Sequence, residues 1–160
     1  MKKCILKLIS INLIPLIVLS GFSIDVFAQA NSKNDPLTQS ELNQCSKVDY
    51  KEAKDELDLL ISKIQSLYDD TIFLEAFEES QVHWEKQLLL DLKMRFPEAS
   101  KGIYGSIFPV CYYSNLEKLI RERISFLTEW ANGHEDGEMC SGSVLHEYYI
   151  DDSRKIEEDY

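Results

Sequence analysis

The chain has 160 residues, and its 28 Asp and Glu outnumber its 17 Lys and Arg to give a net charge of −11 at pH 7. An acidic surface of this size repels nucleic acid and anionic membranes and attracts cationic proteins. Solubility alone is the competing explanation for the charge. The length suits one domain with a modest core.

Residues 1–30 have the pattern of a secretory signal peptide. A short basic segment precedes an apolar run over residues 8–26, and a small-x-small Ala-Gln-Ala sequence ends at Ala30. An uncleaved membrane anchor is the alternative, but Pro15 and Asp25 weaken the run as a permanent span. The prediction is cleavage after Ala30 and a periplasmic or secreted mature protein without a membrane segment.

The remaining chain divides into a polar linker (31–36), a helical domain (37–132) and an acidic tail (133–160). The domain begins with Thr38 and Glu41 at the spacing of a capping box, in which each side chain bonds the backbone of the other residue. Apolar residues then recur at helical spacing, and no Pro or Gly occurs over residues 38–70. One long amphipathic helix is predicted there.

A break at residues 69–71 precedes a second helical pattern that ends before Pro97. A third begins near Pro109, which suits a first turn, and ends at Gly133. Three amphipathic helices with short connections predict an all-α fold, an antiparallel three-helix bundle. The acidic tail is predicted to be largely irregular, apart from one short element between Val144 and Ile150.

Three cysteines follow the signal peptide: Cys45, Cys111 and Cys140. An oxidising compartment favours a disulfide. In an up-down-up bundle, Cys45 and Cys111 lie near helix starts at the same end, whereas Cys140 lies at the other. We therefore expect a Cys45–Cys111 disulfide to brace the bundle. Cys140 is then free, capped, or joined to a second chain as part of a structural subunit.

No pattern in the sequence indicates catalysis. The chain has no Gly-rich phosphate loop and no G-x-S-x-G, and its histidines lack metal-ligand spacing. The prediction is a non-enzyme without metal or cofactor. The loop over residues 97–108 is the clearest candidate contact, with Lys101, Tyr104 and Ser106 available to a protein partner. An ordinary helix connection, with its apolar residues tucked under the bundle, is the equally simple alternative.

Several motifs, taken in order, resemble the LprI-type lysozyme inhibitor family of secreted bacterial proteins. The match starts at Leu37 with L-T-x-x-E-L-N-x-C, which contains Thr38, Glu41 and Asn43. Gln81 and Trp84 form its Q-x-x-W. A G-S-I loop begins at Gly105, and an R-x-x-x-L motif begins at Arg123. The resemblance spans about residues 37–131. Trp84 is expected in the core, and Arg123 is expected to bond within the bundle.

The resemblance implies stoichiometric inhibition of lysozyme, a cationic muramidase. Three positions depart from the family pattern: Gln87 and Leu88 replace an aromatic residue and an arginine, and Leu92 replaces a frequent cysteine. Cys111 is also displaced. These departures leave the predicted fold intact, but they affect the surface that members of the family share. An immunity-type or adaptor protein that binds another secreted toxin or envelope protein is the alternative function.

Overall fold

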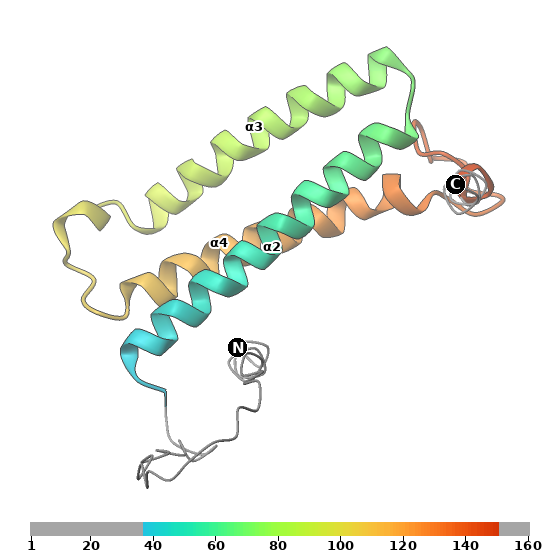
Figure 1. Cartoon of the computed structure of the whole chain (residues 1–160). Helices are drawn as coiled ribbons and strands as arrows, with labels where there is room; N and C mark the ends of the chain where they lie inside the picture. The colour runs from blue at the N-terminus through green and yellow to red at the C-terminus, as the bar shows by residue number, and fades with distance from the viewer. Residues whose placement is uncertain (1–36, 151–160) are drawn as a thin grey trace, which may run out of the picture.

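The computed structural model describes residues 37–150, so the predicted signal peptide, the linker and the last ten residues lie outside it. Three long helices run up, down and up: α2 (Gln39–Leu67), α3 (Thr71–Arg95) and α4 (Phe108–Asn132). A 3-10 turn, η1 (Ala99–Lys101), lies in the connection between α3 and α4 (Figure 1). The predicted all-α fold with three main helices is confirmed. No helix in the described part is long and apolar enough to cross a membrane.

Side-chain caps fix where the helices begin. The hydroxyl of Thr38 accepts a hydrogen bond from the Glu41 amide at 3.3 Å, and the Glu41 carboxylate accepts from the Thr38 amide at 2.7 Å. This is the predicted capping box. Asp70 caps α3 with its own side chain, whose carboxylate accepts from the amide of Ile72 at 2.9 Å. Gly133 ends α4, because its φ of 82° is disfavoured for side-chain-bearing residues.

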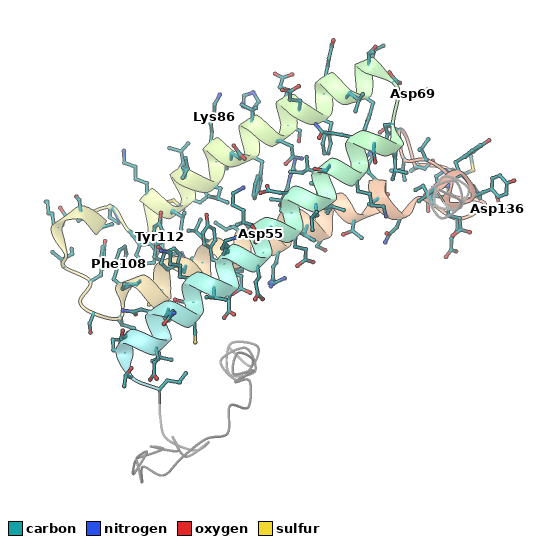
Figure 2. All side chains as sticks on the ribbon, in the orientation of Figure 1. Asp55, Asp69, Lys86, Phe108, Tyr112 and Asp136 are labelled. Carbon is teal, nitrogen blue, oxygen red and sulfur yellow. The ribbon has the colours of Figure 1, made fainter. Side chains whose placement is uncertain are left out.

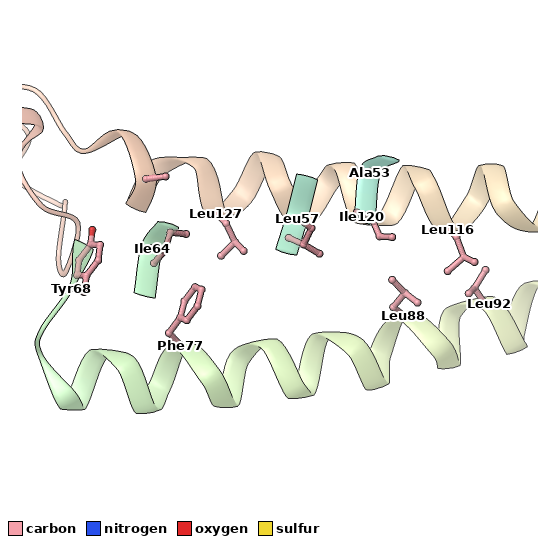
Figure 3. Close-up of a cluster of buried hydrophobic side chains, with 11 residues drawn as sticks. Ala53, Leu57, Ile64, Tyr68, Phe77, Leu88, Leu92, Leu116, Ile120 and Leu127 are labelled. Atoms are coloured by element: carbon pink, nitrogen blue, oxygen red, sulfur yellow. The ribbon is translucent and has the colours of Figure 1, made fainter. Parts of the chain in front are cut away.

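The three helices do not contribute equally to the core. α2 lies along α4, and the fully buried Ala53 lets the two backbones approach closely. α3 lies further out and reaches the pair through larger side chains such as Phe77, Leu88 and Leu92 (Figure 3). Leu57, Ile64 and Leu127 fill the centre between them. The attachment of α3 therefore depends on a few long side chains.

The first part of the tail is largely irregular, as predicted, with one short helical element, but it is packed against the bundle. Residues 134–150 fold back on the bundle, where Val144 and Ile150 are buried. The His134 amide donates to the Leu145 carbonyl, and the Glu147 amide donates to the His134 carbonyl, both at 3.0 Å. Residues 147–150 are helical. The acidic composition hid a small set of apolar residues that complete one end of the core.

Tyr68 connects the tail to the bundle. Its hydroxyl donates to the Trp130 carbonyl and accepts from the Leu145 amide, both at 3.1 Å. Burial raises the pKa of Tyr68 above its ordinary value of 10.0. The neutral phenol thus stabilises the docked tail below pH 10, and this contribution is lost as the pH rises through the higher pKa of the folded state.

We expect Tyr68→Phe to release the tail while the bundle stays folded. The Leu145 amide loses its acceptor, which costs about 1–3 kcal/mol, so its hydrogen exchange should accelerate about tenfold or more. The same amide in the unmodified protein should lose protection above pH 10. Tyr149→Phe, at a side chain exposed to 65%, is the matched control. Equal exchange in both variants would contradict the assigned role of Tyr68.

The predicted Cys45–Cys111 disulfide is wrong, because Cys111 is a free thiol in the structure. The prediction placed both residues at the correct end but ignored direction around the helix axis. At 3.6 residues per turn, Cys111 lies about 140° around α4 from the buried Leu116. Its thiol therefore points away from the packed stripe of α4. Cys140 is also a free thiol, and it is exposed.

Candidate protein-binding surface

Three of the motif residues meet between α3 and α4, around the side chain of Arg123. Its Nη2 donates to Ser80 Oγ at 2.8 Å, and its Nε donates to Gln81 Oε1 at 3.3 Å. The guanidinium carbon lies 5.6 Å from the ring centre of Trp84 and 5.1 Å from that of Phe126. These contacts hold α3 against α4. They confirm that Arg123 bonds to another helix and that Trp84 packs against the core.

Arg123 is a buried cation, only 9% exposed, and no carboxylate in residues 37–150 forms an ion pair with it. Burial lowers the pKa of its guanidinium. Because a guanidinium only donates, it fixes the Gln81 amide with its oxygen inward. The Nε2 atom of Gln81 is then buried without a hydrogen-bond partner in the described part. The cluster fits a structural clamp better than a ligand site.

The other motif residues also have local structural contacts. Thr38 and Glu41 form the cap of α2, and Asn43 Oδ1 accepts from Gln39 Nε2 at 2.8 Å. Arg121 forms ion pairs with Glu117 at 2.8 Å and with Glu56 at 3.1 Å. Sequence motifs thus mark how the helices begin and how they are held together.

The predicted contact loop is more closely packed than its sequence suggests. Tyr104 stacks on Phe108 at 5.4 Å and meets the edge of Phe96 at 5.6 Å. Its hydroxyl accepts from the Glu98 amide at 3.5 Å. Lys101 forms an ion pair with the Glu98 carboxylate. Tyr104 therefore completes an aromatic cluster at this end of the bundle, near Phe108 and Tyr112 (Figure 2).

Ser106 is exposed, as predicted. The apolar side chains that this loop leaves open to solvent are Ile103, at 60% exposure, and Ile107, at 46%. The loop thus presents isoleucines and a paired lysine instead of a free lysine and an open aromatic ring. The loop therefore combines features of both interpretations. It packs as a helix connection around Tyr104, and its tip stays exposed as a contact loop would.

The described charges divide the molecule into two unlike ends. We call residues 37–50 and 91–112 the loop end, where four acidic and four basic side chains balance. We call residues 63–79 and 129–150 the acidic end, where Lys63 is the one Lys or Arg. Asp69 and Asp136 mark this end in Figure 2. The carboxylates of the acidic end are Asp69, Asp70, Glu75, Glu78, Glu79, Glu129, Glu135, Asp136, Glu138 and Glu147.

An apolar groove of about 210 Å³ opens between α3 and α4 at the acidic end. Phe73, Phe77 and Trp130 line it together with Phe126, which is 55% exposed. The Ser143 hydroxyl from the docked tail closes one side and accepts from Trp130 Nε1 at 3.1 Å. Sequence reasoning missed this groove, because Ser143 joins it only when the tail folds back.

A second groove, of about 190 Å³, lies between α2 and α3 near the middle of the bundle. Leu57, Leu88 and Trp84 line it, and Lys54 and Glu85 stand at its edges. Lys54 is paired with Asp58 at 3.0 Å. This groove is apolar, and the charges around it are balanced.

Two histidines of the tail lie close together. His134 and His146, twelve residues apart in the sequence, have ring centres 5.1 Å apart. His146 Nε2 is 2.9 Å from the Asp136 carboxylate. No group of three His, Cys, Asp or Glu side chains in residues 37–150 is arranged to hold a metal ion. The histidine pair joins the first and last parts of the described tail to each other.

Comparison with known proteins gives a family match. A family model described as "Lysozyme inhibitor LprI" matches residues 30–127, which include α2, α3 and most of α4. Searches of curated proteins and of solved structures gave no match. The matched range contains the capping box, the Gln81–Trp84–Arg123 cluster and Phe126, and it stops before the docked tail. The chain belongs to the LprI family of lysozyme inhibitors.

Proposed function

We propose that this protein is a secreted or periplasmic inhibitor of lysozyme that acts by stoichiometric binding and catalyses no reaction. The family match over residues 30–127 is the observation that carries the proposal. The charge of the chain supports it, since a net −11 favours association with a cationic enzyme. The signal-peptide pattern before Ala30 is consistent with delivery to the compartment where lysozyme acts.

Binding without catalysis requires a surface that a protein partner can cover. The two ends of the bundle offer different surfaces. The loop end presents Lys101, Tyr104 and Ser106, which remain one hypothesis for entry into the lysozyme cleft. Pairing of Lys101 with Glu98 and stacking of Tyr104 on Phe108 reduce what these side chains can offer. The acidic end has the charge that complements a cationic enzyme.

The test is lysis of a peptidoglycan suspension by a c-type lysozyme, with and without the protein recovered from the periplasm of an expressing bacterium. We expect inhibition that saturates near one-to-one and weakens as salt is added, because exposed charges are screened within about 10 Å at 0.1 M. Sequencing of the recovered chain should give Asn31 as its first residue. Undiminished lysis at a large molar excess would contradict the proposed function.

A further inference from the structure

The excess of negative charge in residues 37–150 lies at one end of the bundle. The loop end is electrically balanced, whereas the acidic end has Lys63 as its one basic residue in the described chain. The Nζ atom of Lys63 donates to the Ala131 carbonyl at 2.9 Å, so this cation is already bound to the helix end. Long-range attraction therefore orients a cationic protein toward the acidic end.

The apolar groove at this end offers an exposed aromatic residue as an anchor. Phe126 is 55% exposed although its neighbour Leu127 is buried. Its ring lies 5.3 Å from the ring of Trp130, and both side chains line the groove. Aromatic residues beside a hollow are the kind of feature that dominates binding energy in protein interfaces.

Carboxylates flank this aromatic anchor. Glu122 and Glu129 lie four residues before and three residues after Phe126, so both are on its side of α4. Glu129 is exposed and forms no ion pair within residues 37–150. Glu122 reaches Lys118 only at 3.7 Å, in solvent. A cationic side chain of a partner would thus find carboxylates beside the groove.

We propose that the α3–α4 groove around Phe126 is the docking site for lysozyme, which would insert an apolar side chain flanked by Lys or Arg. This inference rests on the proposed function and names the surface that performs it. The groove between α2 and α3 fits such a segment less well, because Lys54 and Glu85 at its edges balance and leave no excess of negative charge. The loop end lacks the excess of negative charge.

The test compares charge and shape variants by their dissociation constants for a c-type lysozyme at low salt. Phe126→Ala and Glu129→Lys should each raise the Kd about tenfold or more, as expected for a central aromatic anchor and a reversed flanking charge. Ile107→Ala truncates an apolar residue of similar exposure at the loop end. Glu85→Lys makes the same charge change beside the other groove. Both controls should stay within about threefold of the unmodified protein.

The possible results separate the two proposals. If the unmodified protein binds lysozyme and both groove variants bind it equally well, the groove is not the docking site. A weaker complex with Ile107→Ala would also contradict the groove and would point to the loop end. Absence of any complex with the unmodified protein would overturn the proposed function together with its docking site. Phe126→Ala could weaken binding by loosening the fold, and Glu129→Lys separates this effect from loss of the docking site. Glu129 is exposed, so reversing its charge places no charged group in the core.

Discussion

Arg123→Ala is expected to lower the free energy of unfolding by about 2–4 kcal/mol. The substitution removes the hydrogen bonds to Ser80 and Gln81 and the packing against two aromatic rings. It also leaves a cavity at the junction where α3 meets α4. Because α3 depends on few long side chains, the effect should appear first as exposure of this helix. Urea unfolding followed by circular dichroism and by tryptophan fluorescence, to which Trp84 and Trp130 contribute, measures both changes.

Arg121→Ala is the matched control, two residues earlier on the same helix. Arg121 also has two partners, Glu117 and Glu56, but its side chain is 38% exposed. Ion pairs in such a position contribute about 0.2–1 kcal/mol, so this variant should remain within that range. A loss of similar size in the two variants would show that Arg123 acts as an ordinary surface charge, and the assigned clamp would be wrong.

Local rules predicted the helices well, because each boundary depends on residues within a few positions. Thr38 and Glu41 were recognised as a cap from their spacing alone. Pro97 and Gly133 marked helix ends through backbone restrictions that need no tertiary information. The packing of Trp84 against the core followed from its place on an apolar stripe, and Arg123 was expected to bond within the bundle.

Features that depend on rotation around a helix were harder to predict. The proposed disulfide was correct in the height of Cys111 along the bundle and wrong in its direction, and only direction decides whether two thiols meet. Tyr104 was assigned to solvent because its loop contains glycines. Its neighbours Phe96 and Phe108 were known from the sequence, but their convergence on one ring requires the helix ends in place.

In the candidate site too, the sequence identified structural residues and missed the exposed surface. The family motifs identified residues that hold the bundle together, and none of Gln81, Trp84 and Arg123 is free to meet a partner. Phe126 lies inside one of these motifs but was not singled out, because exposure at one helical position depends on how far α3 stands from α4. The net charge of the sequence did not reveal the acidic end, because residues 63–79 and 129–150 come together only in the folded chain.

The docked tail depends on the glycine at the end of α4. Gly133→Ala should detach residues 134–150 from the bundle. Gly133 has φ 82° and ψ −179°, a region that is essentially restricted to glycine and costs other residues about 1–3 kcal/mol. A Cβ added there would lie 2.8 Å from the Cα and N atoms of Glu147, so backbone would have to move. Releasing the tail is the easiest response, and it exposes Val144 and Ile150.

Hydrogen exchange at the His134 and Glu147 amides measures this release, because their bonds join His134, next to Gly133, to the segment around Leu145 and Glu147 that folds back on it. We expect both amides to lose most of their protection in Gly133→Ala, while amides in the middle of α2 and α4 keep theirs.

Gly142→Ala is the control: its φ is 59°, but no atom lies within 4 Å of the added Cβ. It should cost about 1–2 kcal/mol from the left-handed backbone alone and keep the tail in place. Since Ser143 closes the groove beside Phe126 only when the tail is docked, Gly133→Ala should also weaken lysozyme binding if that groove is the docking site. Unchanged protection at His134 and Glu147 would show that the close approach at Gly133 does not hold the tail.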